Sequence, residues 1–495
     1  MHYWLALIIP FFSFLLQSYP RLFNRYFGVD VWTRLLEIEH VRRSDHKIPG
    51  RITKGFIIRG FFDYPIAFPW MFSFLPRKFL LKLEPFVSPF FDVIQNFLVF
   101  VISLQLGLDV RVALLAQLTY MLTPLIPVEN SYLTPRSLGY LNFTLALYPL
   151  LLYHVNGNPL FLILGFLFTC LLFLTHRFAL QSFVLICLFF TGVDRSPVYV
   201  LNLLGGFLLV TFVTEGYYLR VLKGHLSNIY FWVVNYQYRF AHQIYGNQKA
   251  KRFDWVGKIY WLLSAFSPFF LFGVNTWAIS GFIYLYLVHT SSIAANQVFI
   301  KMGLWIIFFY VFGAIVLKVK RLIPIGEGQR YLEMAMVPSS ILSSVLFFFF
   351  YERFGTIGLV VFILMVLGNL ALIIFVQVKG IITDKNRSLT KELNDAFTYI
   401  NKLPGLPRIM CIPHQITTMT VYNTKADVLV NADNPGLMKI MDFYPILKRS
   451  VKELAKMYKL DYLLLRESFA TLQDLRLKQA NIVFKSGDVL LVKLA

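Results

Sequence analysis

Long apolar runs separated by polar segments fill most of this chain, and the pattern predicts an α-helical protein that crosses a membrane many times. A helix needs roughly 20 mainly apolar residues to span about 30 Å of hydrocarbon. Runs near this length predict about twelve to thirteen transmembrane helices. The runs lie at 3–18, 90–107, 111–128, 138–154, 159–175, 178–193, 197–214, 257–274, 276–292, 299–317, 334–350 and 355–378. Short linkers at 107–109, 154–159 and 194–197 force the neighbouring runs into antiparallel hairpins.

A long polar loop at 19–88 follows the first apolar run. Within it, Asp30 precedes a stretch whose apolar residues recur at helical spacing, with charged residues on the other face. This pattern predicts a helix that starts near Asp30 and lies along the membrane surface. The proline-bounded stretch at 65–76 is expected to form a second interfacial segment that leads back to the bilayer.

From residue 380 onward the period of the apolar residues changes and predicts a small soluble α/β domain. Strands are expected at 408–412, 427–431, 462–465 and 489–493, and a helix is expected at 438–458. The predicted organisation is therefore a transmembrane domain at 1–379 and an α/β domain at 380–495.

Composition agrees with this architecture. Of the 495 residues, 57% are hydrophobic and only 15% are charged, whereas soluble domains carry roughly 45–50% apolar and about 25% charged residues. The net charge of +21 is concentrated in loops and in the C-terminal segment, interleaved with apolar runs, which favours anionic membrane lipid over nucleic acid as a partner. The three cysteines have no spacing that predicts a metal site or a disulfide framework.

The first loop holds the leading candidate for chemistry. Asp30 lies shortly after the first apolar run and among arginines. A carboxylate in this setting can take a proton from an acceptor hydroxyl while arginines hold an anionic donor. The same residue can instead serve only as a helix cap, and both interpretations stay open at this point.

The order of motifs in this loop resembles the first external loop of the GT-C superfamily of integral-membrane glycosyltransferases. The motifs are Asp30-Val31-Trp32-Thr33, Lys47-Ile48-Pro49 and Asp63-Tyr64-Pro65. The resemblance implies inverting transfer of a sugar from a polyprenyl-phosphate-linked donor to a hydroxyl of a glycan, lipid or protein. It also implies a multi-pass protein of the plasma (inner) membrane with its active site on the external face. In this family pattern Asp30 is the expected general base and Asp63 is its rival.

Further residues are candidates for binding the donor phosphate or its lipid. They are Arg42, Arg43, Arg136, His176, Arg330 and Tyr331. An even number of predicted crossings separates Arg136 and His176 from the first loop, so they are expected on the same side of the membrane. The predicted crossings place Arg330 on the opposite side. The segment at 326–333 nevertheless resembles one with an Arg-Tyr pair that precedes the last spans in these transferases, where an arginine would clamp the phosphate, and this favours the same side.

The polar loop at 215–256 is rich in tyrosine and histidine, and Tyr218 and His225 are its candidates for acceptor binding. Tyrosines can stack on sugar faces and donate hydrogen bonds, but a tyrosine belt at the membrane interface explains the pattern equally well. The sequence contains no metal-ligand motif. A lipid monophosphate donor requires no cofactor, and a divalent cation stays an open alternative.

These observations leave several functions open. The leading one is a glycosyltransferase of cell-envelope polysaccharide biosynthesis. The alternatives are a transporter or flippase of lipid-linked saccharides, and a polysaccharide polymerase or ligase that uses a lipid pyrophosphate donor. The predicted spans are almost free of charge, whereas polar residues gather in the early loop, and this favours surface chemistry over alternating access.

Overall fold

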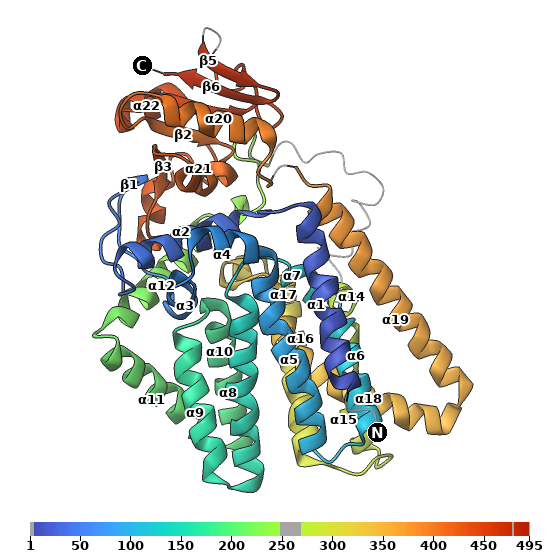
Figure 1. Cartoon of the computed structure of the whole chain (residues 1–495). Coiled ribbons are helices and arrows are strands. Elements are labelled where there is room, and N and C mark those ends of the chain that lie inside the picture. The colour runs from blue at the N-terminus through green and yellow to red at the C-terminus, as the bar shows by residue number, and fades with distance from the viewer. Residues whose placement is uncertain (1–3, 248–268, 386, 478–479, 495) are drawn as a thin grey trace. The chain divides into compact units, whose positions relative to one another are not determined.

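The computed structural model describes residues 4–247, 269–385, 387–477 and 480–494 (Figure 1). The chain forms two compact units, each assembled from separated segments. The first unit takes its described residues from Met1–Phe23, Lys82–Tyr218 and Asp254–Thr383, and the second from Asn24–Leu81, Leu219–Phe253 and Asp384–Ala495.

Apolar α-helices make up the first unit. Its helices are α1 (Leu5–Phe23), α5 (Val87–Gln105), α6 (Val110–Met121), α7 (Leu125–Glu129), α8 (Arg136–Asn156), α9 (Pro159–Phe173), α10 (Arg177–Asp194), α11 (Val198–Val213), α14 (Phe269–Val274), α15 (Ile279–His289), α16 (Gln297–Lys318), α17 (Gly328–Tyr331), α18 (Met336–Phe354) and α19 (Thr356–Gln377). Short helical turns join them: η1 (Glu84–Phe86), η3 (Thr276–Ala278), η4 (Lys320–Ile325), η5 (Leu332–Ala335) and η6 (Val378–Ile382). Helices α4 (Arg77–Leu83) and α12 (Tyr217–Val234) pass from one unit to the other.

Among the described residues, seven helices are long and apolar enough to cross a membrane, or up to eight if one bent pair forms a single span. The seven are Leu5–Phe23, Arg77–Gln105, Arg136–Asn156, Arg177–Asp194, Gln297–Lys318, Gly328–Phe354 and Thr356–Ile382, and the bent pair is Val198–Val213 with Tyr217–Val234. The protein is therefore a multi-pass membrane protein, as predicted. Several expected spans instead form shorter apolar helices, at Val110–Met121, Pro159–Phe173 and Thr276–His289. The expected span at 257–274 falls mostly outside the described residues.

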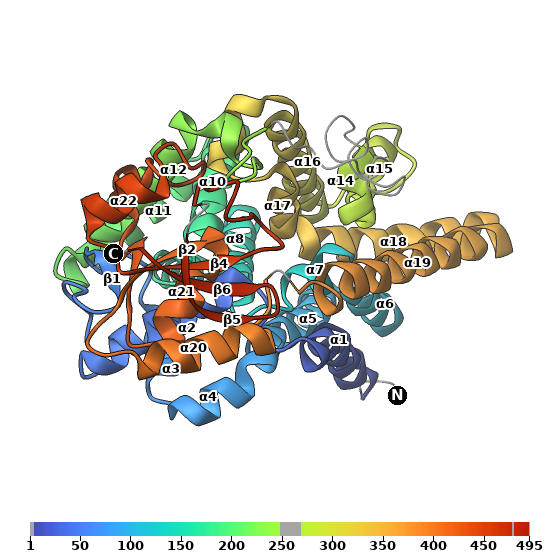
Figure 2. The same ribbon diagram turned by 90° about the horizontal axis from the view of Figure 1, so that it is seen from above.

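The predicted hairpins are confirmed where the linkers are short. Asp109 caps α6 by accepting a hydrogen bond from the backbone N–H of Arg111 at 2.8 Å, and Asn158 caps α9 by accepting one from Leu160 at 3.0 Å. Gly157 takes the left-handed conformation that the turn before Asn158 requires. Helices α18 and α19 meet at a turn at Gly355; they overlap in Figure 2, and Figure 1 shows that they diverge from this turn.

The first unit contains more buried charge than the apolar runs indicate. Asp92 in α5 is 1% exposed and accepts hydrogen bonds from Gln17, Tyr120 and Asn130 at 2.5, 2.7 and 2.8 Å. Lys301 in α16 forms a 2.5 Å ion pair with Asp194 at the end of α10. These charges lie inside the helix bundle because each has a polar partner there. The expectation that the spans are almost free of charge is therefore wrong for these helices.

A six-stranded sheet forms the centre of the second unit, in the order β1-β3-β2-β4-β6-β5. Its strands are β1 (Phe56–Ile58), β2 (Arg408–Ile412), β3 (Asp427–Asn431), β4 (Tyr462–Arg466), β5 (Asn481–Ser486) and β6 (Val489–Lys493). The pairs β1–β3, β3–β2 and β2–β4 are parallel, and β4–β6 and β6–β5 are antiparallel. The other elements of this unit are α2 (Val29–Arg43), α3 (Ala67–Ser73), η2 (Tyr236–Tyr238), α20 (Lys391–Lys402), η7 (His414–Ile416), α21 (Thr417–Asn423), η8 (Asn434–Ile440) and α22 (Val451–Tyr458).

All four strands predicted in the C-terminal segment are confirmed. The expected helix at 438–458 is shorter, because Pro445 interrupts the backbone and Ser450 begins α22 by accepting a hydrogen bond from the N–H of Glu453 at 3.3 Å. Strand β5 was missed because its residues are exposed or half-buried, so they lack the apolar run of a central strand. Strand β1 was missed because it is short and far from the others in sequence.

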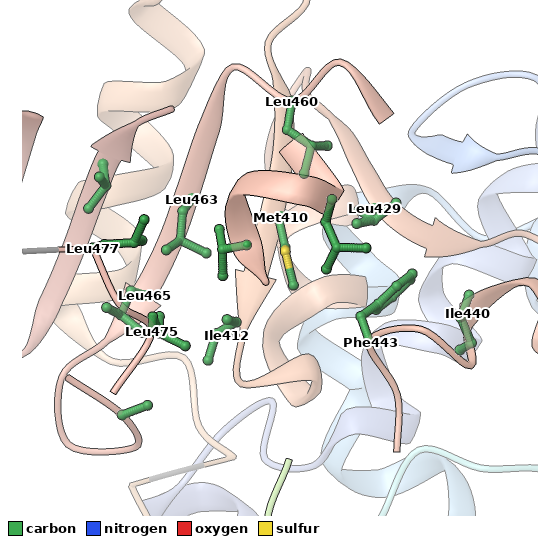
Figure 3. Packing of buried hydrophobic residues seen from close by; sticks show 14 of the residues in the cluster. Met410, Ile412, Leu429, Ile440, Phe443, Leu460, Leu463, Leu465, Leu475 and Leu477 are labelled. Atoms are coloured by element: carbon green, nitrogen blue, oxygen red, sulfur yellow. The ribbon is translucent and has the colours of Figure 1, made fainter. Parts of the chain in front are cut away.

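The hydrophobic core of the second unit lies against the sheet. Met410 and Ile412 of β2, Leu463 of β4 and Leu454 of α22 are almost completely buried in it. Figure 3 shows the strand side chains of this core together with Phe443, which follows η8. Apolar residues on successive strands and on one face of a helix bury against one another in this way in α/β domains generally.

The first loop contributes directly to this sheet. Residues of β1 pair with β3, with Phe56 opposite Val428 and Ile58 opposite Asn431. The predicted division of the chain between residues 379 and 380 stays a prediction, but the compact second unit contains most of the first loop as well as the C-terminal module. Backbone pairing therefore holds part of the 19–88 loop in a defined conformation.

Candidate functional site

Asp30 lies in the first turn of α2, as the sequence predicts. Gly28 is the N-cap residue of α2, and its φ of 101° is a conformation that glycine adopts readily. No side-chain hydrogen bond caps this end of the helix. Val31, Leu35 and Ile38 form the buried face of α2, each with 0% exposure, whereas Asp30 is exposed on the other side. The described residues give the Asp30 carboxylate no hydrogen bond, and the helix start favours its negative charge.

Arg34 follows Asp30 by one helical turn and interacts electrostatically with it. Its guanidinium donates to Glu37 at 2.5 Å and lies 3.7 Å from the centre of the Tyr64 ring. Burial alone would lower the pKa of Arg34, but the charges of Glu37, Tyr64 and Asp30 hold that pKa above its ordinary value. Arg34 is therefore a fixed positive charge beside Asp30. The sequence signal for it was the spacing of four residues along one helix.

Asp63 has a different environment. It is 5% exposed, and it accepts hydrogen bonds from the backbone N–H of Asn434 at 3.0 Å and from the Asn434 side chain at 3.1 Å. Asn434 is the first residue of η8, so the Asp63 carboxylate holds the start of that helical turn. Asp433 precedes Asn434, and its pKa is raised by burial and by the nearby charge of Asp63. Asp63 thus has a structural role in the α/β module, whether or not it has a second one.

The two arginines near the end of α2 also differ. Arg42 donates to the backbone carbonyls of Ser73 and Leu75 at 3.1 and 2.6 Å and to Glu39 at 2.5 Å, so its guanidinium ties α2 to the end of α3. Arg43 is exposed and lines a cavity in the second unit. Of the two, Arg43 is the one whose charge is available to a ligand.

In the first unit, the structure brings together residues that lie far apart in sequence. His176 caps α10, where its Nδ1 accepts a hydrogen bond from the N–H of Ala179 at 3.3 Å. A Cβ atom at Gly139 of α8 would come within 2.6 Å of the His176 side chain, so the absence of a side chain lets these two helix starts meet. His176 therefore lies against the first turn of α8, beside Gly139, which follows Arg136 by about one helical turn.

Arg330 and Tyr331 join the same group. The Arg330 guanidinium lies 4.4 Å from the centre of the Phe178 ring, two residues after His176. Tyr331 receives a hydrogen bond from Gln181 of α10 at 2.8 Å and donates one to the Ile325 carbonyl at 2.7 Å. Arg330 therefore lies beside the start of α10, close to His176. The count of predicted spans, which included the run at 257–274, separates these two residues by the membrane, whereas the resemblance keeps them on the same side.

Arg136 completes this group together with an acid that sequence reasoning did not single out. Arg136 forms an ion pair with Glu129 and also interacts electrostatically with Glu333. Glu333 is 1% exposed, and neither oxygen of its carboxylate has a hydrogen-bond partner among the described residues. An acid in an otherwise apolar stretch was the sequence signal for it. We refer to these residues as the α8–α10–α17 polar cluster: Arg136, His176, Arg330, Tyr331 and Glu333.

The two acceptor-binding candidates are Tyr218 in the first unit and His225 in the second. Tyr218 is 3% exposed, and its ring packs edge-on against the rings of Phe173 and Phe207, with ring centres 5.0 and 5.9 Å apart. Its ring is therefore already in contact with two other aromatic rings. His225 is half-buried in α12. The role of Tyr218 and His225 in acceptor binding stays a prediction. In the part of the chain that is described, no group of three or more His, Cys, Asp or Glu residues is arranged to hold a metal ion.

The apolar helices and the polar sites at their ends define a polytopic membrane protein. Its fold is similar to that of the oligosaccharyltransferase of Archaeoglobus fulgidus in the apo form, with a TM-score of 0.60 and 13% identity over 94% of this chain and 70% of that one. The archaeal oligosaccharyltransferase AglB from the same organism, in complex with an inhibitory peptide and a dolichol-phosphate, gives a TM-score of 0.59 with 12% identity over 95% of this chain and 70% of that one.

A third solved structure, ArnT from Cupriavidus metallidurans bound to undecaprenyl phosphate, aligns over 99% of this chain and 96% of that one with 13% identity and a TM-score of only 0.41. No protein-family model matches the sequence, and no curated protein sequence matches it. The likeness of the oligosaccharyltransferase confirms the GT-C resemblance at the level of the fold.

Proposed function

We propose that the protein is a membrane glycosyltransferase that moves a sugar from a polyprenyl-phosphate-linked donor to an acceptor hydroxyl, with inversion at the anomeric carbon. The observation that carries the proposal is the state of Asp30, an exposed carboxylate at a helix start with no hydrogen bond from the described residues and a fixed cation one turn away. Such a group is available to accept a proton. The GT-C fold and the dolichol-phosphate in the AglB complex support the donor class.

In the proposed reaction, Asp30 takes the proton of the acceptor hydroxyl. The acceptor oxygen forms a bond to the anomeric carbon as the bond between that carbon and the phosphate oxygen breaks on the opposite face. The departing lipid phosphate carries negative charge, which guanidinium groups stabilise. Arginine suits this role because it offers two parallel N–H donors to phosphate oxygens. The assignment of Arg136 and Arg330 to the donor phosphate stays a prediction from the sequence.

The inner membrane, the external face and the nature of the acceptor belong to the same proposal. Arg42 is a weak phosphate candidate within it, because its donors are engaged by the α3 end. Asp63 stays the alternative base, although a second role would require it to release the start of η8. No metal is required by this reaction, since cationic side chains supply the positive charge.

The test uses the purified full-length protein and a panel of radiolabelled polyprenyl-phosphate and polyprenyl-pyrophosphate sugars. We expect one monophosphate donor to lose its label to acceptor or water. Asp30→Asn and Asp30→Ala should lower that rate by about 10²–10⁴-fold, the usual contribution of a general base, while donor binding persists. Full activity in both variants would remove Asp30 from the mechanism, and turnover of pyrophosphate donors alone would favour a polymerase or ligase.

One observation favours a second candidate function. Buried charges inside helix bundles, such as the Lys301–Asp194 pair and Asp92, also occur on substrate pathways of transporters. A flippase would move a lipid-linked saccharide across vesicle membranes without releasing free polyprenyl phosphate. Measuring label translocation and label transfer in the same proteoliposomes therefore separates the two functions.

A further inference from the structure

A cavity of about 500 Å³ lies in the second unit. None of its lining residues has a role in the proposed reaction, although the sequence made Arg43 a candidate for binding the donor phosphate. Its wall combines the later part of α2, the turn that leads into β1, the start of α4 and the connection from α21 to β3. The volume falls within the roughly 300–1,000 Å³ range of small-molecule sites.

The cavity is lined by more positive than negative side chains. The cations come from four separate segments and are Arg43, Lys54, Arg77 and Lys425, and all are exposed. Cations from four segments that meet around one space repel one another unless an anion lies between them. The lining therefore has the charge of an anion-binding site.

The two acids in the lining do not cancel this charge, because each has its own partner. Glu39 accepts a 2.5 Å hydrogen bond from Arg42, which is not in the lining. Asp427 accepts from the backbone N–H of Gly55 at 3.0 Å and pairs with Arg59 at 3.3 Å. The acids thus neutralise neighbouring arginines and leave the lining cations uncompensated.

The cations themselves bind only neutral groups of the described protein. Arg77 donates to the hydroxyl and the backbone carbonyl of Tyr422 at 3.1 and 3.4 Å, and Lys425 donates to the Leu403 carbonyl at 2.5 Å. Arg43 and Lys54 form no ion pair with any described residue. These contacts orient two of the four cations without removing their charge.

A neutral polar group completes the wall. His40 lines the cavity, and its Nε2 atom is buried with no hydrogen-bond partner among the described residues. Burial and the nearby Arg43 charge lower the pKa of His40 to about 4, so the ring is neutral at pH 7. A neutral imidazole can exchange one hydrogen bond with a ligand oxygen or hydroxyl at each ring nitrogen.

The backbone at Gly55 fixes the position of Lys54 in this wall. Gly55 has a φ of +83°, and a Cβ atom there would lie 2.6 Å from Val421. The turn therefore requires glycine, and the hydrogen bond from its N–H to Asp427 ties it to β3. Lys54 is thus carried on a turn whose geometry the sheet holds.

We infer that this cavity binds a phosphate-bearing small molecule or head group, which is a binding site separate from the sugar-transfer chemistry. Convergent arginine and lysine side chains suit the several acceptor oxygens of phosphate. The size of the cavity leaves room for an organic part beyond the phosphate, against the Tyr422 ring and the neutral His40.

Binding of two probes to the purified full-length protein tests the inference. Pyrophosphate represents a soluble phosphate ligand, and dihexanoyl phosphatidic acid below its micelle concentration represents a lipid head group. We expect at least one probe to bind at a single saturable site, and Lys54→Ala and Arg43→Ala to weaken that binding about tenfold each, the loss expected for one charge-assisted hydrogen bond. Saturation by only one probe identifies the source of the ligand.

Matched variants complete the test. Lys54→Arg keeps the charge and should keep the wild-type affinity, and Lys452→Ala, which removes an exposed lysine of α22 outside the cavity, should leave binding unchanged. The lining cations are exposed, so their substitution is not expected to unfold the protein. Absence of saturable binding of both probes, or equal affinity in Lys54→Ala and wild type, would overturn the inference. Neither outcome depends on glycosyl transfer, because the readout is binding alone.

Discussion

The start of α2 and the segment around Asp63 carry the two acidic motifs of the same loop, yet the structure gives the two acids opposite environments. Asp30 is exposed and receives no hydrogen bond from the described residues. Asp63 is 5% exposed and is held by Asn434, which lies 371 positions away in sequence. A general base must be free to accept a proton, whereas a buried, hydrogen-bonded carboxylate stabilises structure. The contrast teaches that burial and partners, and not the motif, separate the two roles.

The largest expected effect compares the two acids directly. Asp30→Asn should lower turnover by about 10²–10⁴-fold, because the amide cannot accept the proton, with no change in the thermal unfolding midpoint. Turnover and thermal unfolding are measured on the same preparations. Loss of turnover in Asp63→Asn but not in Asp30→Asn, at equal stability, would reverse the assignment of the base.

The second prediction extends the comparison to a buried acid with a charged partner. Arg21 and Glu84 form an ion pair in the first unit, and both side chains are 0% exposed. Arg21→Met should lower the free energy of unfolding by about 3–5 kcal/mol, because it leaves a buried carboxylate without its main counter-charge. The double variant with Glu84→Met should recover much of this loss. Unfolding in detergent measures both, and a single variant as stable as wild type would contradict the prediction.

The third prediction concerns the structural role of Asp63. Asp63→Asn should lower the free energy of unfolding of the second unit by about 1–3 kcal/mol, because the amide can no longer accept hydrogen bonds from Asn434 with both oxygens. Asn434→Ala serves as the partner variant, and the two changes together should cost less than their sum. Strictly additive costs would show that the two residues do not act through each other.

The smallest expected effect comes from His40, which lies on the same helix as Asp30. Burial and Arg43 lower its pKa from 6.5 to about 4. The unfolded chain therefore binds a proton between these pH values and the folded chain does not, so stability is complete above pH 6.5 and falls as the pH is lowered toward 4. His40→Gln should reduce the difference in unfolding midpoint between pH 7 and pH 4.5. An unchanged difference would show that other groups, such as the half-buried His414, account for the pH dependence.

The sequence by itself determined the elements that depend on local pattern. Apolar runs predicted the membrane helices, alternating and continuous apolar residues predicted strands β2, β3, β4 and β6, and helical spacing predicted the buried face of α2. These predictions succeed because burial of one face imposes a period on the sequence, and the period is visible in any short window. The candidate Asp30 was found in the same way, from its place at a helix start.

Only the tertiary structure decided which distant segments meet. It paired β1 of the first loop with β3, placed Asp63 on η8, and gathered Arg136, His176 and Arg330 with Glu333. No local period encodes such contacts, because they depend on how whole helices and strands pack after they form. Backbone hydrogen bonding in the sheet and close helix approach at glycine supply the geometry, and both join residues separated by many turns of chain.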